Sequence, residues 1–290
     1  MQLKTPSKIN LYLRIVGKLP NGYNEIETVF VPLPNIYDVI KIDLTKSQNL
    51  VSNKITISST HPDVPLNENN LCYKAAELYS SAANIQINCN IDIEKTIPIA
   101  AGMGGGSSDA AAVLLLLNKQ YKSLDKNQLK EIALKLGADV PYFLNPTPAL
   151  GKGVGENLET IDLAKGLYFV ILAPLFPVSA AWAYKNFKKN NNTDNIVVVE
   201  NLLTEMKNGN WNSLSKLIYN DLAKSLYDKF PILSMLKDEM LNLGALNAEI
   251  TGSGPTLFAI CSNKLHAEEI TKKITEKYSS SFYCAYSSTT

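Results

Sequence analysis

The chain carries, at residues 98–109, the sequence PIAAGMGGGSSD, in which four glycines stand within five positions. Before it, residues 85–94 alternate isoleucine or cysteine with polar residues, as a β-strand does. After it, residues 109–118 are rich in alanine and leucine, which favours a helix. Glycine has no Cβ, so the backbone of such a loop can approach a ligand closely. The helix start adds N–H groups and the positive end of its dipole, and the stretch is therefore predicted to bind phosphate.

Two common phosphate motifs do not fit this loop. It lacks the Gly-Lys-Ser/Thr ending of a Walker A sequence, and Ser107 stands where a third dinucleotide-binding glycine would be. Ser107 and Ser108 can cap the helix, bind a phosphate oxygen or reach a magnesium ion, and Ser108 is the candidate metal ligand. The alternative is an ordinary strand-to-helix turn with a serine cap. So many glycines make that alternative costly in chain entropy.

Composition narrows the class of protein. The chain has 290 residues, 46% of them hydrophobic, which is enough for two compact domains. A net charge of +1 gives no electrostatic reason to expect nucleic acid or an anionic membrane as a partner. No apolar run approaches the length of a membrane span, and the first residues lack the core of a signal peptide. Four separated cysteines predict free thiols in the cytoplasm, and two histidines make a histidine metal site improbable.

The remaining pattern predicts an α+β fold. The chain closes with a strand, a glycine turn, a strand, a helix and a strand, which has a β-α-β-β-α-β character once an earlier strand and inserted helices are added. Glycines at residues 151–155 suggest a domain boundary, with one domain at 1–155 and a second at 156–290. The expected strands are 7–16, 25–33, 39–44, 85–94, 167–173, 248–251, 256–261 and 282–287; the expected helices are 109–118, 127–136, 180–188, 199–206, 211–219, 232–243 and 266–278.

Three shorter motifs are candidates for chemistry. Asp139 follows a helix end and precedes Pro141, so its carboxylate can act as a general base or serve as an ordinary helix cap or turn residue. Lys8 lies at the start of a strand, where it can meet an anionic group or be a surface lysine at a sheet edge. The sequence TGSGP at 251–255 can bring backbone amides to a ligand or form a plain hairpin turn.

Together these stretches resemble one kinase family. The matching segments are PSKINLYLRIVGKLPNGYNEIETVF (6–30), IPIAAGMGGGSSDAAAVLLLLN (97–118), LGADVPYFL (136–144), GVGE (153–156) and TGSGPTLFA (251–259). They resemble the 4-diphosphocytidyl-2-C-methyl-D-erythritol kinase family of the galactokinase, homoserine kinase, mevalonate kinase and phosphomevalonate kinase superfamily. The resemblance implies a ribosomal-S5-like N-terminal domain, a ferredoxin-like C-terminal domain and a monomer or weak homodimer.

The resemblance also implies an activity and its residues. ATP with Mg²⁺ would phosphorylate the 2-hydroxyl of a cytidine diphosphate derivative of methylerythritol, in the non-mevalonate route to isoprenoid precursors. Asp139 matches the family's catalytic base and Lys8 its catalytic lysine. The substrate-binding positions are Asn10, Tyr23, Asn24, Asp139 and Tyr184, with the two tyrosines stacking on cytosine. The ATP-binding positions are Pro98, Gly102, Met103, Gly104, Gly105, Gly106, Ser107 and Ser108.

Two positions depart from the family pattern. Asn24 replaces the usual histidine after Gly22-Tyr23, and Ala180 replaces the usual threonine after Ser179. Asparagine still offers a donor and an acceptor to a base edge. These changes are the support for one alternative, a superfamily kinase for another small alcohol. A second alternative, a non-catalytic ligand-binding module, would predict loss of Lys8, Asp139 or the glycine loop, and all three are present.

Overall fold

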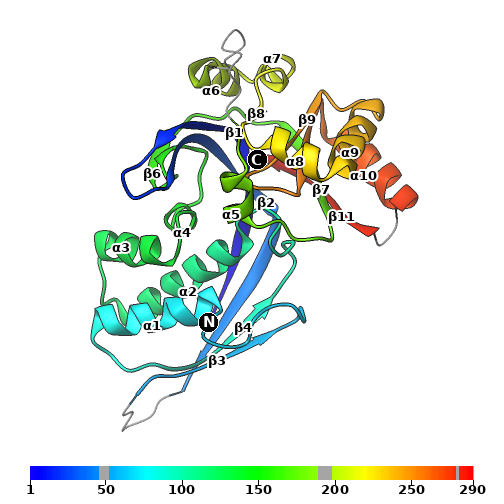
Figure 1. Cartoon of the computed structure of the whole chain (residues 1–290). Helices are drawn as coiled ribbons and strands as arrows, with labels where there is room; N and C mark the ends of the chain where they lie inside the picture. Colours follow the sequence, from blue (N-terminus) through cyan, green and yellow to red (C-terminus); the bar gives the residue numbers. More distant parts are fainter. Residues whose placement is uncertain (46–51, 189–197, 279–280, 290) are drawn as a thin grey trace. The chain divides into compact units, whose positions relative to one another are not determined.

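The computed structural model describes residues 1–45, 52–188, 198–278 and 281–289, and it contains both helices and sheets (Figure 1). The α+β class predicted from the sequence is therefore confirmed. Two compact units interleave along the chain. The first unit comprises Met1–Ser7, Ile36–Ile99 and Gly104–Pro146; the second comprises Lys8–Asn35, Ala100–Met103 and Thr147–Thr290. A boundary at residues 155/156 stays a prediction.

The first unit combines helices with segments of β2, β3 and β4 and with the beginning of β1 (Gln2–Lys18). The last part of β2 (Asn24–Leu44) pairs antiparallel with β4 (Asn88–Glu94), and β3 (Lys54–Ser59) runs parallel to β4. Isoleucines of β4 are buried while its polar residues are half-buried, as the alternation predicts. The helices are α1 (Leu71–Ala83), α2 (Gly105–Tyr121), α3 (Lys126–Leu136) and α4 (Val140–Phe143).

Helix α2 is the central helix of this unit. Its residues from Ser108 to Leu114 are all buried, so it has little amphipathic character, and it packs on α1, α3 and α4. Small alanines allow this close packing from several sides, which explains the Ala-rich sequence. Helix α3 carries a capping box, in which Asp125 and Gln128 satisfy each other's backbone N–H groups.

The second unit contains a four-stranded antiparallel sheet. Its order is β11-β7-β10-β9, formed by β7 (Leu167–Pro174), β9 (Asn247–Ile250), β10 (Leu257–Cys261) and β11 (Phe282–Thr289). With α9 (Pro231–Asn242) and α10 (Lys264–Tyr278), the chain order is β7-α9-β9-β10-α10-β11. This is the β-α-β-β-α-β arrangement of a ferredoxin-like fold.

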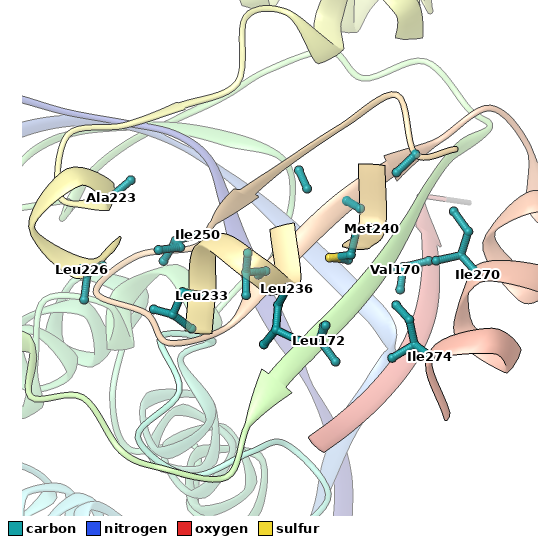
Figure 2. Close-up of a cluster of buried hydrophobic side chains, with 14 of the residues drawn as sticks. Val170, Leu172, Ala223, Leu226, Leu233, Leu236, Met240, Ile250, Ile270 and Ile274 are labelled. Atoms are coloured by element: carbon teal, nitrogen blue, oxygen red, sulfur yellow. The ribbon is translucent and has the colours of Figure 1, made fainter. Parts of the chain in front are cut away.

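The core of the second unit lies on this sheet. Figure 2 shows Val170 and Leu172 of β7 near Leu236 and Met240 of α9, with Ile274 of α10. All five are buried, and each such side chain contributes roughly 1.5–3 kcal/mol of transfer free energy. The helical spacing of the apolar residues thus predicts both helices correctly.

The other elements of the second unit extend from β1 and β2. β1 (Gln2–Lys18) runs parallel to β8 (Tyr219–Asn220), and β2 pairs with β5 (Ala149–Gly153), which pairs with β6 (Asn157–Thr160). The helices are α5 (Ala180–Lys185), α6 (Val199–Asn208), α7 (Trp211–Ser215) and α8 (Ala223–Lys229).

Several predicted elements differ from the structure. The predicted helix 180–188 ends early, at Lys185, and the predicted strand 85–94 begins only at Asn88. The predicted helix 211–219 is wrong at its end, because α7 ends at Ser215 and Tyr219 forms a strand. The predicted strands 25–33 and 39–44 form one strand, since β2 continues through Pro34.

Two further findings, on cysteines and on membrane spans, apply to the described residues alone. The four cysteines there are free thiols, as predicted, and no helix there is long and apolar enough to span a membrane.

Candidate active site

The glycine stretch opens helix α2 in the first unit. The N-cap is Gly104, with a φ of 75°, a left-handed conformation that favours glycine. Gly104 has no side chain, so no side-chain cap covers the first N–H groups of the helix. Gly106 is exposed and Ser107 is half-buried at this end. The local structure is the open helix start that the sequence predicts for a phosphate site.

A buried ion-pair cluster lies directly against this helix start. Lys95 Nζ is 2.5 Å from Asp38 Oδ2 and 2.6 Å from Asp109 Oδ2, and the three side chains are at most 5% exposed. Asp38 Oδ1 accepts hydrogen bonds from the backbone N–H groups of Thr96 and Ile97. A Cβ on Gly105 would come within 2.9 Å of Lys95 Nζ. Sequence reasoning missed this cluster, because isolated charges on a strand and a helix give no sign that they meet.

Burial and the neighbouring charges shift the pKa values of Asp109 and Lys95 in this cluster. Burial, which disfavours a charged carboxylate, raises the pKa of Asp109 to about 7, and neighbouring Asp38 adds to the rise. Burial acts to lower the pKa of Lys95, but the two carboxylates outweigh it and hold that pKa above its ordinary value. Asp109 Oδ1 is buried without a hydrogen-bond partner. Burial thus raises the pKa of the Asp109 carboxyl in spite of its ion pair with Lys95.

The hydroxyl of Ser108 faces strand β1. It donates to the carbonyl oxygen of Pro6 at 2.6 Å and hydrogen-bonds the hydroxyl of Thr5, and Ser108 is fully buried. This geometry gives no support to Ser108 as a magnesium ligand, and its metal role stays a prediction. Across the described ranges, no three His, Cys, Asp or Glu side chains form a group that could hold a metal ion.

In the second unit, Lys8 is a buried lysine. Only 3% of it is exposed, so the alternative of a surface lysine at a sheet edge is wrong. Its Nζ donates to Asn10 Oδ1 at 2.7 Å and to the carbonyl oxygen of Gly102 at 3.3 Å. Its backbone N–H donates to the carbonyl oxygen of Met103. The structure thus brings Lys8, Asn10 and the start of the glycine stretch together.

The second glycine motif packs on the same place. Residues 251–256 connect β9 and β10, so the hairpin-turn interpretation is confirmed. A Cβ on Gly102, whose φ is +78°, would lie 2.6 Å from the carbonyl oxygen of Thr251. A Cβ on Gly252 would lie 3.1 Å from Asn10 Oδ1 and 3.6 Å from Lys8 Nζ. These close approaches explain why both backbones need glycine.

Asp139 precedes helix α4 in the first unit. It occupies the N-cap position, but its side chain accepts no cap hydrogen bond, and it is half-buried. The cap geometry therefore gives no support to an ordinary capping aspartate, whereas Asp139 does lie in a turn, as the other half of that alternative expects. Its role as a base stays a prediction. Pro98, also assigned to the ATP site, is half-buried in the same unit.

The proposed cytosine residues lie in different surroundings within the second unit. Tyr23 is 67% exposed in the turn between β1 and β2, so it is not a packing residue. Asn24 begins β2 and is half-buried. Tyr184 lies on α5, partly buried against the hydrophobic core of the unit. An exposed tyrosine in a turn fits a ligand-stacking role, whereas Tyr184 also has a packing role.

Comparison with known proteins shows the family. Residues 70–145 match the GHMP kinases N terminal domain, and residues 202–280 match the GHMP kinases C terminal domain. A 4-diphosphocytidyl-2-C-methyl-D-erythritol kinase of Chlorobium chlorochromatii is 40% identical over 279 residues, covering 92% of this chain and 90% of its own. The chain belongs to this kinase family. The family kinase of Clostridium perfringens is 37% identical and covers 96% of this chain and 94% of its own length.

Solved structures agree with this membership. The crystal structure of a 4-(cytidine 5'-diphospho)-2C-methyl-D-erythritol kinase is 29% identical, with a TM-score of 0.82 over 99% of this chain and 98% of that one. A homoserine kinase from Cytophaga hutchinsonii, 16% identical with a TM-score of 0.79 over 100% of this chain and 94% of that one, shares the fold. As a member of the 4-diphosphocytidyl-2-C-methyl-D-erythritol kinase family, the chain is an ATP-dependent kinase with the two-domain α+β fold predicted from its sequence.

Proposed function

We propose that this kinase transfers the γ-phosphate of ATP to the 2-hydroxyl of 4-diphosphocytidyl-2-C-methyl-D-erythritol. The reaction belongs to the non-mevalonate route to isoprenoid precursors. The observation that carries the proposal is 40% identity, over nearly the whole chain, to a kinase named for that substrate. The open N-terminus of α2 supports it, because a polyphosphate needs unsatisfied N–H groups at such a place.

The roles of the residues follow from their chemistry. Asp139 accepts the proton of the substrate hydroxyl, as a carboxylate acting as a general base can. Lys8 supplies a buried positive charge, which is worth more to a developing phosphate charge than an exposed one. Magnesium bound to the ATP phosphates would offset their charge. Tyr23 and Tyr184 stack on the cytosine, and Asn10 holds the erythritol part.

An acceptor panel tests the proposal. The purified kinase is incubated with Mg·ATP and, separately, with 4-diphosphocytidyl-2-C-methyl-D-erythritol, mevalonate or homoserine. Phosphorus NMR then identifies any phosphorylated product. We expect ADP and a new phosphomonoester with the cytidyl substrate alone.

The panel also separates the alternatives. Turnover of another alcohol without turnover of the cytidyl substrate would contradict the proposed substrate and keep the kinase. Ligand binding without any turnover would indicate a non-catalytic module. Asn24→His, which restores the usual family residue, should preserve or improve turnover of the cytidyl substrate; a large loss would contradict the proposed contact of residue 24 with the base.

A further inference from the structure

A line of buried hydrogen bonds connects Lys8 to the backbone of its own strand. Lys8 Nζ donates to Asn10 Oδ1 at 2.7 Å, and Asn10 Nδ2 donates to Thr28 Oγ1 at 2.7 Å. Thr28 Oγ1 in turn donates to the carbonyl oxygen of Tyr12 at 2.7 Å. Lys8 and Asn10 are 3% exposed and Thr28 is fully buried. Because solvent does not reach these groups, each polar group must find its hydrogen-bond partner within the protein, and here the partner is the next residue in the line.

The direction of the line is fixed at its far end. A carbonyl oxygen only accepts, so the single hydroxyl proton of Thr28 goes to Tyr12 and only lone pairs of Thr28 remain for Asn10. Asn10 must therefore turn its NH₂ toward Thr28, which leaves Oδ1 toward Lys8. The reverse amide orientation would place an NH₂ against the Lys8 ammonium, two donors facing each other. The hydrogen-bond network, and not the shape of the amide, decides this orientation.

Thr251 supports the same orientation from the β9–β10 turn. Its Oγ1 accepts from the backbone N–H of Asn10 at 2.8 Å, so its own proton points elsewhere. That proton is directed at Asn10 Oδ1, at 3.4 Å. Thr28 acts at shorter range, and its methyl group lies close to Gly151, which has no side chain of its own. A Cβ on Gly151, opposite in β5, would lie 3.2 Å from Thr28 Cγ2.

We propose that Thr28 is a positioning residue for phosphate transfer: its hydroxyl sets the Asn10 amide so that Oδ1 holds the Lys8 ammonium in place. The inference rests on the proposed role of Lys8 in the reaction. It adds a residue that touches neither the phosphate nor the acceptor. Replacement of the hydroxyl by a methyl leaves the buried Asn10 Nδ2 without an acceptor, and the amide loses the contact that fixes its place, so that Oδ1 no longer holds the Lys8 ammonium where the wild-type protein has it.

The test is a pair of substitutions at Thr28. Thr28→Val keeps the size and removes the hydroxyl, and we expect kcat to fall about 10- to 100-fold with KM for ATP within about 3-fold of wild type. Thr28→Ser keeps the hydroxyl and should retain kcat within about 3-fold. Equal losses in the two variants would assign Thr28 to packing and overturn the proposal.

A second background removes the amide itself. In Asn10→Asp, a carboxylate presents an oxygen to Lys8 in either orientation, so adding Thr28→Val should change kcat by less than about 3-fold. The same 10- to 100-fold loss, about the size of a lost buried hydrogen bond, in both backgrounds would contradict the orientation argument.

One measurement needs no variant. Neutron diffraction of the wild-type protein should place the Thr28 hydroxyl deuteron toward the Tyr12 carbonyl and both Asn10 amide deuterons away from Lys8. The opposite amide orientation would refute the proposal even if Thr28→Val does not fold. A wild-type protein inactive toward every acceptor would instead contradict the proposed function.

Discussion

Gly105→Ala tests whether residue 105 must be glycine because the protein itself packs closely there, and not because a ligand binds there. The added Cβ would lie 2.9 Å from Lys95 Nζ and 3.0 Å from Ile97 Cγ2, where ordinary contacts are about 3.5–4.0 Å. The side chain of Lys95 is flexible in general, but here two carboxylates hold its Nζ at 2.5 and 2.6 Å. Relief of the overlap therefore lengthens a buried ion pair or shifts the start of α2.

The expected loss of stability follows from two opposing terms. An extra methylene in a packed interior costs about 1–3 kcal/mol. Alanine in place of glycine stabilises a helix by up to about 1 kcal/mol, less at its first residue. The overlap prevails, and with a helix gain of about 0.5 kcal/mol we expect a net loss of about 0.5–2.5 kcal/mol. At about 2–4 °C per kcal/mol, the melting temperature should fall by roughly 1–10 °C.

Gly106→Ala is the matched control. Gly106 is the next residue, it is exposed, and a Cβ there would meet only Leu71 Cδ1, at an ordinary 3.8 Å. The same chemical change should therefore leave the melting temperature unchanged or raise it slightly. Calorimetric scans of both variants without nucleotide measure the difference. If Gly105→Ala melts at or above the temperature of Gly106→Ala, the packing argument is refuted.

Three further outcomes are expected. Asp139→Asn should lower kcat by about 10²–10⁴, the range for a lost general base, with ATP affinity nearly unchanged; near-normal turnover of the folded variant would remove the assignment. Tyr184→Ala should raise KM for the cytidyl substrate about 5- to 100-fold, since one stacked base is worth about 1–3 kcal/mol, and a loss of stability alone would indicate a packing residue. In the folded protein the Asp109 pKa is about 7 against an ordinary 3.8, so the native state binds the proton more tightly and stability should fall as pH rises through this window. Asp109→Asn should flatten the slope of melting temperature against pH between about 4 and 7, and an unchanged slope would exclude Asp109 as its source.

Local sequence patterns predicted the elements whose apolar residues follow a clear period. The alternation in β4 and the helical spacing of α3 and α9 both identify their elements correctly. Helix α1 was missed. Its buried positions are alanine, cysteine, serine and tyrosine, which give little hydrophobic contrast with its other face. Helix α8 was missed because it is short: its seven residues form too few turns for a helical period of apolar residues to appear.

The candidate site was predictable only in part, since its residues come together through tertiary structure. The glycine stretch and Lys8 are visible as local motifs, and the hydrogen bond from Lys8 to Gly102 joins them across 94 positions of the chain. Thr28 carries no such signal: one threonine in a strand looks like any other. The same holds for Asp38, whose burial against Lys95 depends on the β2–β4 pairing. Local sequence patterns show which chemically active residues the chain contains. The pairing of distant strands decides which of their side chains come into contact.

The four glycines at residues 102–106 are present for different physical reasons. Gly102 meets the Thr251 carbonyl and Gly105 meets Lys95, so a side chain at either position would collide with the protein itself. Gly104 needs its left-handed backbone to begin α2. Gly106 has ordinary space around it and a helical backbone, and neither reason applies. Glycine lowers helix stability at this position. Gly106 lies at the exposed end of α2, where a nucleotide phosphate would approach. The explanation that fits Gly106 is therefore that a bound phosphate must come close to the N–H groups of the helix.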